Sequence, residues 1–378
     1  MLNRLLEIDK HASAFILGPR GTGKTHWLKD KFANCLYFDL LHDETFTAFL
    51  ANPSILEDRI PSGYDDYIII DEIQKVPPLL NEVHRLIEHS NKRFILTGSS
   101  ARALRKRGIN LLAGRALTYH MHPLTVAEIG ETFDLAKLLR YGALPKAHTL
   151  KDPSHYLASY VQTYLKEEVQ QEALTRNLAL FTRFLNIASF SQGETLNYSA
   201  IARELGSNKQ SISNFFDILD DLLIAVRIPV FTRRAKRQTV SQMKFYYFDT
   251  GVYRTLRPKG PLDSEEELSG AALETLFLQQ ARAINDYYRL GYDFYYWRTT
   301  DQHEVDFVLY GEKGFHAIEI KRKQKLQAKD FKGLEIFGED YAEAKRFVFY
   351  GGNSRYTHKD IHVIPFAQAI KILPELFE

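Results

Sequence analysis

Short apolar runs alternate with helical patterns over the first 120 residues of the chain. The apolar runs predict strands at residues 12–17, 34–40, 66–72, 93–100 and 116–122, and segments between them, such as 77–89, have helical spacing. Strands that alternate with helices are typical of a parallel sheet. The run YIII at 67–70 is apolar on both faces, as a central parallel strand is. The pattern therefore predicts an α/β domain built on a parallel sheet.

Farther along the chain the pattern becomes helical and then returns to strands. Residues 124–190 have helical spacing throughout, and residues 194–231 predict a short helix, a glycine, a longer helix and an extended run. The later strands are predicted at 243–249, 293–299, 303–323 (a pair) and 345–352, with a helix at 269–284. We place domain boundaries near residues 140 and 240, which divides the chain into 1–140, 141–240 and 241–378.

Length, charge and cysteine content limit the class of protein. The 378 residues support roughly two to three domains of about 150 residues each. The formal net charge of +2 gives no chain-wide attraction to nucleic acid, so any such binding must come from local clusters. Cys35 is the only cysteine, which excludes an intrachain disulfide and fits a reducing compartment. We find no secretory signal and no run of about 20 apolar residues, and we expect a cytoplasmic protein without a membrane span.

Residues 18–25, GPRGTGKT, match the pattern G-x-x-x-x-G-K-T between a predicted strand and a predicted helix. The glycines let backbone N–H groups wrap phosphate oxygens, and the helix that follows presents its N-terminal dipole to the anion. Lys24 is expected to reach the β- and γ-phosphates of ATP, and the Thr25 hydroxyl to ligate Mg²⁺. A glycine-rich turn that happens to contain Lys-Thr is the alternative. The residues predicted to bind the nucleotide are Gly18, Pro19, Arg20, Gly21, Thr22, Gly23, Lys24, Thr25 and Asp71.

Two carboxylates, Asp71 and Glu72, end the predicted strand YIIIDE. Asp71 is expected near the metal, usually through water, and Glu72 is expected to polarise the attacking water as a general base. The alternative is that this acidic pair simply begins the next loop.

Three further side chains are candidates for contact with the γ-phosphate or with the transition state. Thr97 or Ser99, at the end of RFILTGSS, could sense the γ-phosphate, whereas Ser99 or Ser100 could instead cap a helix. Arg115 could neutralise transition-state charge, in its own site or in that of a neighbouring chain. A surface salt bridge is the alternative for Arg115.

Residues 196–231 have the pattern of a helix–turn–helix followed by a strand, as in a winged helix. Gly206 separates the two helices, and Ser207 is expected to cap the second one. The first turns of the second helix carry polar side chains, including Lys209, where a recognition helix meets DNA. The basic run RRAKR at 233–237 lies where a wing would supply phosphate contacts. The alternative is a module that serves only packing or protein interaction.

Residues 303–323, HEVDFVLYGEKGFHAIEIKRK, predict two strands that carry charges where a buried hairpin prefers apolar side chains. Residues two apart on a strand share a face, so Glu319 and Lys321 point the same way, and Asp306 comes from the preceding strand. This is the constellation of PD-(D/E)xK nucleases. An exposed hairpin with ordinary alternation of polar and apolar residues is the alternative.

In such a nuclease the carboxylates hold Mg²⁺, and the metal lowers the pKa of the water that attacks the phosphodiester. Asp306 and Glu319 are the expected metal ligands, and Lys321 is expected to orient the water and to stabilise transition-state charge. Such sites commonly include a carboxylate from an upstream helix, and Glu274 lies on a helical pattern in the right order.

The order of GPRGTGKT, YIIIDE, LTGSS, LAGR and HPLTVAEI resembles a prokaryotic family of AAA+-like ATPases. The resemblance implies an ATPase core followed by a winged-helix region and a restriction-endonuclease-like C-terminal domain. It implies nucleotide-binding roles for Gly18, Gly23, Lys24, Thr25, Asp71 and Glu72. It also makes Arg115 a candidate arginine finger, which an ATP-driven ring or dimer would supply in trans.

Two functions follow from these patterns. In the first, ATP hydrolysis repositions a winged helix and a Mg²⁺-dependent nuclease-like domain on DNA, in a single chain or in a homo-oligomer. In the second, the nucleotide state controls binding to a protein partner, and the C-terminal domain is catalytically silent. Hydrolysis that DNA stimulates, with a steep salt dependence, would favour the first.

Overall fold

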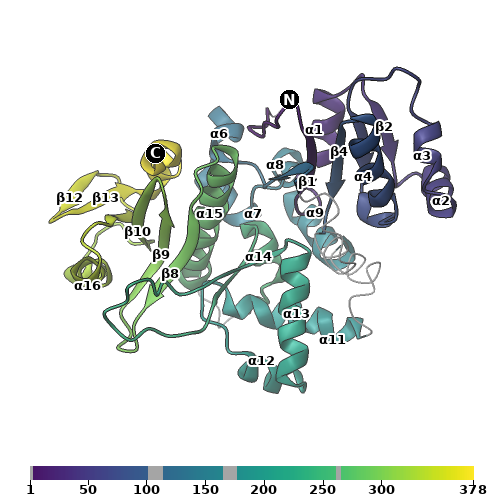
Figure 1. Ribbon diagram of the computed structural model, residues 1–378. Helices are drawn as coiled ribbons and strands as arrows, with labels where there is room; N and C mark the ends of the chain where they lie inside the picture. Colours follow the sequence, from purple (N-terminus) through teal and green to yellow (C-terminus); the bar gives the residue numbers. More distant parts are fainter. Residues whose placement is uncertain (1–2, 101–113, 165–176, 261–264) are drawn as a thin grey trace. The chain divides into compact units, whose positions relative to one another are not determined.

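The computed structural model describes residues 3–100, 114–164, 177–260 and 265–378, which form two compact units (Figure 1). The first unit comprises Met1–Pro123 and Asp221–Leu223, and the second comprises Leu124–Asp220 and Ile224–Glu378. The fold is mixed α/β: a parallel sheet with helices, then a helical region, then a second sheet with helices.

The first unit is built on a five-stranded parallel sheet with the strand order β2-β3-β4-β1-β5. Its strands are β1 (Ser13–Leu17), β2 (Leu36–Asp39), β3 (Ile68–Asp71), β4 (Phe94–Gly98) and β5 (Ala116–His120). Its helices are α1 (Lys24–Lys31), α2 (Asp43–Ala51), α3 (Ile55–Asp58), η1 (Ile73–Lys75) and α4 (Leu79–Ser90). All the strands predicted for this region are confirmed, with ends that differ by two residues at most.

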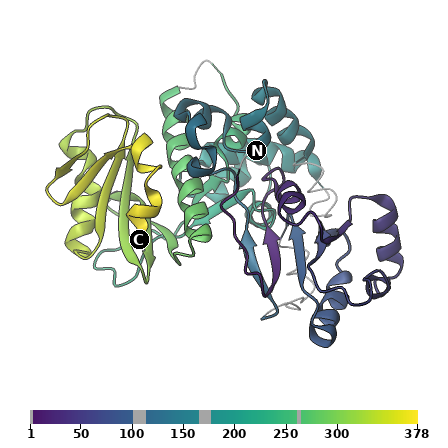
Figure 2. The ribbon, with the colours of Figure 1, turned by 90° about the horizontal axis from the view of Figure 1, so that it is seen from above.

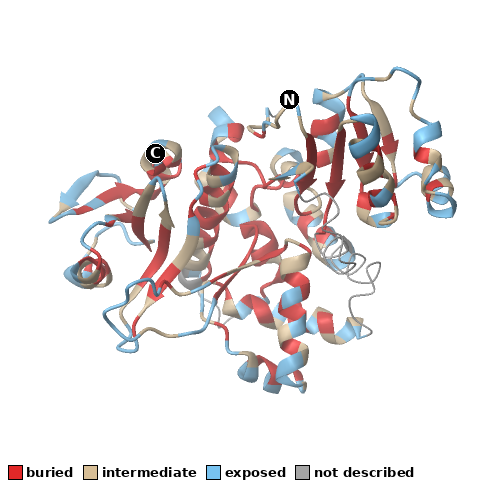
Figure 3. Ribbon diagram, in the orientation of Figure 1, coloured by how far each residue is buried: buried red, intermediate tan, exposed pale blue. Residues whose placement is uncertain are grey.

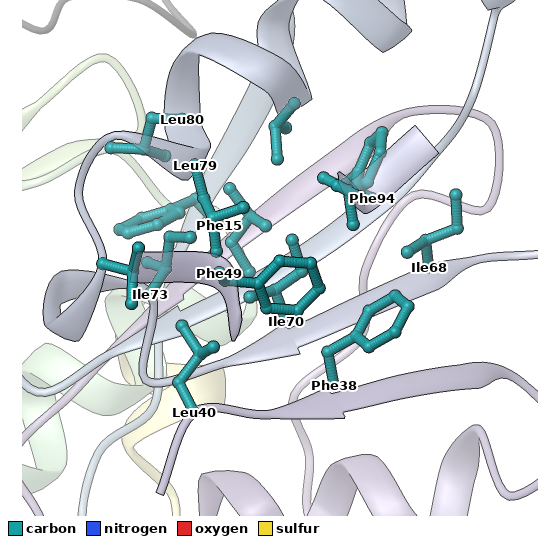
Figure 4. Close-up of a cluster of buried hydrophobic side chains, with 14 of the residues drawn as sticks. Phe15, Phe38, Leu40, Phe49, Ile68, Ile70, Ile73, Leu79, Leu80 and Phe94 are labelled. Carbon is teal, nitrogen blue, oxygen red and sulfur yellow. The ribbon is translucent and has the colours of Figure 1, made fainter. Parts of the chain in front are cut away.

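The core of this unit lies where the central strands meet α2 and α4. Ile68 and Ile70 of β3 and Phe94 of β4 are fully buried (Figure 4). Phe38 of β2 meets Phe49 of α2 edge to face, with ring centroids 5.3 Å apart. The central strands are buried along their whole length (Figure 3), because helical segments cover both faces of a parallel sheet.

Short helices begin the second unit. They are α6 (Val126–Ile129), η2 (Gly130–Thr132), α7 (Leu135–Tyr141), α8 (Pro145–Thr149), α9 (Pro153–Ser159), the π-helix η3 (Tyr160–Tyr164), α11 (Leu178–Ala188), η4 (Ser189–Ser191), α12 (Tyr198–Leu205), α13 (Lys209–Asp221) and α14 (Thr250–Leu256). The predicted helical pattern is confirmed as far as residue 164, and residues 165–176 lie outside the described residues.

A six-stranded mixed sheet follows, with the strand order β12-β13-β11-β10-β9-β8. Its strands are β8 (Asp293–Arg298), β9 (Glu304–Gly311), β10 (Gly314–Lys321), β11 (Lys345–Tyr350), β12 (Tyr356–His358) and β13 (Ile361–Pro365). Its helices are α15 (Glu265–Tyr287), η5 (Ala328–Asp330), α16 (Lys332–Asp340), α17 (Phe366–Ala369) and α18 (Leu373–Phe377). β8, β9 and β10 are antiparallel, whereas β10, β11 and β13 run parallel to one another.

Helices cover both faces of this sheet (Figure 2). On one face, Phe337 of α16 lies against Trp297 of β8, with ring centroids 5.3 Å apart. On the other face, Phe277 of α15 lies against Phe307 of β9, at 4.8 Å. Buried aromatic pairs of this kind contribute about 0.5–1.5 kcal/mol each beyond the area they bury.

The segment predicted as a wing is attached to the C-terminal sheet. It connects β6 (Ala225–Ile228) to β7 (Lys244–Tyr247), two antiparallel strands. The Phe231 N–H donates to the Tyr296 carbonyl of β8 at 2.7 Å. In the basic run, Arg237 pairs with Asp340 at 3.0 Å and with Glu339 at 2.6 Å. Arg237 therefore pairs with carboxylates of its own chain, and its expected role as a phosphate contact stays a prediction.

The two compact units divide after Pro123, whereas the sequence predicts domain boundaries near residues 140 and 240. The Ala143 N–H donates to Asp249 at 2.8 Å, and the Thr250 hydroxyl donates to the Leu138 carbonyl at 2.6 Å. These bonds join α7 to the start of α14. At the second boundary, the Phe231 bond to β8 joins the chain on both sides of residue 240. The three-domain division of the chain stays a prediction.

Candidate functional site

Backbone conformation shapes the phosphate loop between β1 and α1. Gly21 and Gly23 have φ of 82° and 97°, in the left-handed region that favours glycine. A Cβ on Gly18 would lie 2.3 Å from the carbonyl oxygen of Met121, so only glycine fits there. α1 begins at Lys24, directly after the loop, and its first N–H groups can therefore face an anion held in the loop.

Lys24, Thr25 and Asp71 meet beside this loop. The buried Lys24 ammonium donates to the carbonyls of Gly18 at 2.7 Å and Pro19 at 3.3 Å. The Thr25 hydroxyl donates to Asp71 Oδ2 at 2.7 Å. Asp71 is fully buried at the carboxyl end of β3. The structure thus brings together the three residues on which the predicted nucleotide site depends.

Glu72 is held in a strained conformation at the end of β3. Its φ of 61° is in the left-handed region, which a residue with a side chain adopts at a cost of order 1–3 kcal/mol. The Gln74 amide donates to its carboxylate, as does the Ser99 hydroxyl at 3.4 Å. The Glu72 N–H donates to Thr97 Oγ1 at 3.0 Å. Backbone strain that neighbouring groups maintain is common at functional sites.

Two partners in this site were not assigned roles from the sequence. The Tyr37 hydroxyl of β2 donates to Asp71 Oδ2 at 2.5 Å. Burial, and then the charge of Asp71, raises the pKa of Tyr37, so the phenol stays protonated and donates. Gln74 donates to Glu72 and to Ser99 Oγ, the latter at 3.0 Å. The parallel pairing of β2 with β3 could have suggested Tyr37 as a partner of Asp71, because this pairing places β2 directly beside the strand that ends at Asp71.

The donors beside the loop fit Mg²⁺ and a nucleotide. A hydroxyl and a carboxylate, from Thr25 and Asp71, are hard oxygen ligands of the kind that Mg²⁺ takes in nucleotide sites. Lys24 supplies the positive charge that phosphates require. The Thr97 hydroxyl donates to Asp71, and Ser99 is hydrogen-bonded to Gln74 and Glu72. Residues 101–113 lie outside the described residues, so the predicted helix cap at Ser99 or Ser100 stays a prediction.

Arg115 lies at the amino ends of the parallel strands, whereas the phosphate loop lies at their carboxyl ends. Ala116 pairs with Ser13 at the amino end of β1, whereas the loop begins beyond the carboxyl end of β1. With a rise of about 3.3 Å per residue, these two ends are roughly 13–17 Å apart. Arg115 contacts Glu88 of α4 and lowers the pKa of that carboxyl. The arrangement shows the salt bridge and does not support a role in the chain's own site; a role in a neighbouring chain stays a prediction.

The residues predicted as a nuclease site come together at α15, β9 and β10. The Ile320 N–H donates to Asp306 Oδ2 at 2.8 Å, and the Asp306 N–H donates to Glu319 Oε2 at 3.3 Å. The Lys321 ammonium contacts the Glu319 carboxylate. Burial, and then the nearby Asp306, raises the pKa of Glu319 to about 8. The same two causes raise the pKa of Glu274 to about 8.

Lys244 and Tyr246 of β7 belong to the same group of side chains and were missed from the sequence. The Lys244 ammonium contacts Glu304 and lies 3.7 Å from Asp306 Oδ1 and 4.0 Å from Glu274 Oε2. The Tyr246 hydroxyl donates to Glu274 Oε2 at 2.8 Å. The two residues are two positions apart and share a strand face. A lysine within the apolar run MKFYYFD was the available signal.

The carboxylate cluster, Glu274, Glu304, Asp306 and Glu319, does not fit Mg²⁺ as it is arranged. Among the described residues, no three His, Cys, Asp or Glu side chains are arranged as a metal site. Two lysines, Lys244 and Lys321, already pair with these carboxylates. The expected Mg²⁺ roles of Asp306 and Glu319 are therefore not supported by this geometry.

Two helices joined by a turn, α12 and α13, occupy the region predicted as a helix–turn–helix, and the turn differs from the prediction in its cap. Gly206 is left-handed, and the Ser207 N–H donates back to the Ala202 carbonyl at 2.8 Å, which closes α12. Asn208, and not Ser207, caps α13 by accepting from the Ser211 N–H at 2.9 Å. Ser207 cannot cap because its backbone completes the preceding helix. Lys209 is exposed in the first turn of α13.

A cavity of about 720 Å³ lies beside these helices. Its lining includes Lys209, Arg227, Arg298, Asn197 and Gln302. A second cavity, of about 630 Å³, is lined by residues 320–324, IKRKQ. Within the first, Arg227 pairs with Asp217 at 2.6 Å, and Arg298 lies 3.5 Å from Glu304 of the carboxylate cluster. Basic and amide side chains therefore border the cluster.

No helix in the described part of the chain is long and apolar enough to span a bilayer.

Comparisons with known proteins place three family models along the chain. Residues 10–130 match an AAA domain, residues 132–263 match the domain of unknown function DUF8612, and residues 269–369 match the domain of unknown function DUF4143. An uncharacterised protein of Mycobacterium tuberculosis, Rv2008c, is 29% identical over 356 residues, which cover 91% of this chain and 78% of the relative. An uncharacterised protein of Haemophilus influenzae is 22% identical over 219 residues, which cover 53% and 55%.

Two solved structures show remote likeness. The Aeropyrum pernix ORC1 protein in complex with DNA has a TM-score of 0.28 at 13% identity, over 66% of this chain and 87% of that one. A signal transduction ATPase with numerous domains from Pyrococcus horikoshii has a TM-score of 0.23 at 16% identity, over 75% and 46%. Both scores are too low to support an argument. Residues 10–130 are thus similar to an AAA domain, and this match, together with the geometry of the phosphate loop, supports ATPase activity in general.

Proposed function

We propose that the first unit binds ATP with Mg²⁺ and hydrolyses it. The observation that carries this proposal is the contact between Thr25 and the buried Asp71 beside a phosphate loop that contains Lys24. Mg²⁺, when bound, would be held by these two oxygen donors and would neutralise charge on the phosphate oxygens.

The chain's own side chains divide the work of hydrolysis. When ATP binds, the Lys24 ammonium gives up its hydrogen bonds to the Gly18 and Pro19 carbonyls and contacts the β- and γ-phosphates. Glu72 takes the proton of the attacking water, and Gln74 and Ser99 fix the direction of its carboxylate. Thr97 orients Asp71 through its hydroxyl and positions Glu72 through its backbone N–H.

Phosphate release from purified full-length chain tests this half of the proposal. Lys24→Ala should abolish turnover, and a Lys24→Ala protein that hydrolysed ATP normally would refute it. Glu72→Gln should lower turnover by about 100-fold or more while ATP still binds, because a positioned general base contributes roughly 10²–10⁴-fold. Glu44→Gln, at an exposed carboxylate of α2, is the matched control and should leave turnover unchanged.

We also propose that the second unit acts on DNA through α13 and the cavity beside it. The exposed Lys209, the amides of Asn197 and Gln302, and the guanidinium of Arg298 border that cavity. Lysines and arginines supply phosphate contacts, and amides can bind phosphates or base edges. The modest net charge of +2 makes the salt dependence of binding a necessary part of the test.

Fluorescence anisotropy with labelled duplex and single-stranded DNA tests this half. Lys209→Ala should weaken binding and reduce its salt slope by about one. Lys146→Ala, an exposed lysine of α8 in the same unit, should leave both unchanged. Slow ATP turnover that DNA does not affect, with no DNA binding, would favour the alternative, in which the nucleotide state controls a protein partner.

DNA cleavage by the second unit stays a prediction. The convergence of Asp306, Glu319, Lys321 and Glu274 favours it, whereas the poor fit of these carboxylates to Mg²⁺ opposes it. A nuclease assay of wild type against Asp306→Ala, with and without ATP, decides between these observations. Cleavage that requires Asp306 would establish the nuclease, and wild type inert toward every DNA form would remove it.

A further inference from the structure

Lys244 is an ammonium group enclosed inside the second unit. Its side chain is 2% exposed, and β7, which carries it, pairs with β6 outside the six-stranded sheet. A buried ammonium without partners is unfavourable by several kcal/mol or more, so it persists only where carboxylates surround it. Here Glu304, Asp306 and Glu274 lie within 4.0 Å of Nζ. The face of the Tyr296 ring, 5.6 Å from Nζ to the centroid, adds a further favourable contact.

The position of Nζ determines what else the cluster can hold. Mg²⁺ binds carboxylate oxygens at about 2.0–2.1 Å and demands near-ideal octahedral geometry. An ion that bridged Asp306 and Glu274 would therefore lie close to the Lys244 ammonium, and the two like charges would repel each other in a poorly solvated site. The ammonium and a divalent ion that bridged Asp306 and Glu274 would therefore compete for the same carboxylates.

We propose that the Lys244 ammonium takes the place of a divalent cation in the carboxylate cluster and excludes Mg²⁺ and Mn²⁺ from it. In this conformation the C-terminal domain is held together by an internal cation and has no metal with which to activate water. Lys321 contributes a second positive charge at Glu319. The inference is independent of the ATPase proposal, because it concerns the second unit and is tested without nucleotide.

Strand β7 fixes Lys244 in place. Its backbone pairs with Ile228 of β6, and an isolated bridge joins it to Thr195 on the other side. The neighbouring Tyr246 donates to Glu274 from the same strand. A backbone movement that withdrew Lys244 from the cluster would therefore have to break these strand contacts.

Electron paramagnetic resonance of Mn²⁺ titrated into the full chain without nucleotide tests the proposal. Lys244→Met keeps most of the side chain's length and removes its charge. It should bind one Mn²⁺ more than wild type, and Asp306→Asn in the same chain should abolish that gain. Lys146→Met, at an exposed lysine of α8 in the same unit, is the control and should bind no more Mn²⁺ than wild type. Mn²⁺ at 100 times its Kd should raise the unfolding midpoint of Lys244→Met by roughly 5–10 °C.

Two results would overturn the proposal. The first is wild type that binds a Mn²⁺ which Asp306→Asn alone removes, because the ammonium then fails to exclude the metal. The second is a folded Lys244→Met that binds no more Mn²⁺ than wild type. The comparison of wild type with Asp306→Asn decides the matter by itself should Lys244→Met fail to fold with or without Mn²⁺. Neither result depends on whether the first unit hydrolyses ATP.

Discussion

Phe231 attaches the connection between β6 and β7 to the C-terminal sheet. It is 1% exposed, and its ring lies 5.2 Å from Phe315, 5.3 Å from Tyr295 and 5.3 Å from Tyr341, between centroids. Phe231→Ala removes all these contacts and leaves a cavity. Phe→Ala changes in a core lower the free energy of unfolding by about 3–5 kcal/mol.

The chain's two tryptophans permit a selective assay of this effect. Trp27 lies in the first unit and Trp297 in the sheet of the second, where both it and Phe231 belong to one buried cluster. In a Trp27→Phe background, fluorescence therefore follows the second unit alone. With a urea m-value of about 3 kcal/mol/M, Phe231→Ala should lower the unfolding midpoint by roughly 1–1.7 M.

Phe190→Ala serves as the control for Phe231→Ala. Phe190 is 52% exposed, and the Arg257 guanidinium lies over its ring at 3.5 Å, a contact that contributes about 0.5–1 kcal/mol at exposed sites. A Phe231→Ala protein that unfolded at the wild-type urea concentration would refute the attachment of residues 229–243 to β8. That result would favour the interpretation of this segment as a wing that DNA could contact.

Three further predictions concern other parts of the fold. Burial, and then the charge of Lys345, lowers the pKa of His316 to about 4, so the unfolded state binds more protons between about pH 6.5 and 4. The second unit should therefore lose up to about 3 kcal/mol as the pH falls through this window, and His316→Gln should flatten that dependence in urea titrations. Asp249 accepts from Gly251, Val252 and Ala143, and Asp249→Ala should cost about 2–3 kcal/mol in the same assay, with Asn less harmful; an unchanged midpoint would contradict its role as a cap. Gly18→Ala should weaken ATP binding by about tenfold or more in calorimetry, because its Cβ meets the Met121 carbonyl, and wild-type affinity would show that the loop adapts.

The nucleotide site was accessible from the sequence because its geometry is local. The loop at 18–25 is a continuous motif, and parallel strands bring the ends of β1, β3 and β4 to one edge of the sheet. Asp71 and Thr97 therefore had to lie near Thr25. The position of Arg115 was not constrained in this way, since residues 101–113 separate it from the preceding strand. Nothing in the pattern indicates whether Arg115 lies at the amino or the carboxyl ends of the strands.

The second unit depends on contacts between distant segments, and there the sequence was less informative. Asp306, Glu319 and Lys321 could be grouped because adjacent strands with a tight turn leave one arrangement of faces. Lys244 could not, because the pattern does not indicate that β7 lies against α15 and β9. The run at 233–237 has the polarity of an exposed wing, and the contacts that attach it come from Phe231 and from carboxylates of α16.

The β6–β7 pair joins two parts of the second unit that the sequence treats as separate domains. β6 follows α13 after a few residues, and β7 carries Lys244 and Tyr246 into the carboxylate cluster. Hydrogen-bonded strands lie only about 4.8 Å apart, and Ile228 of β6 pairs directly with Lys244 of β7. The strand that follows α13 in the chain is therefore the same strand whose backbone pairs with the buried lysine, so one strand pair connects the exposed Lys209 helix with the carboxylate cluster.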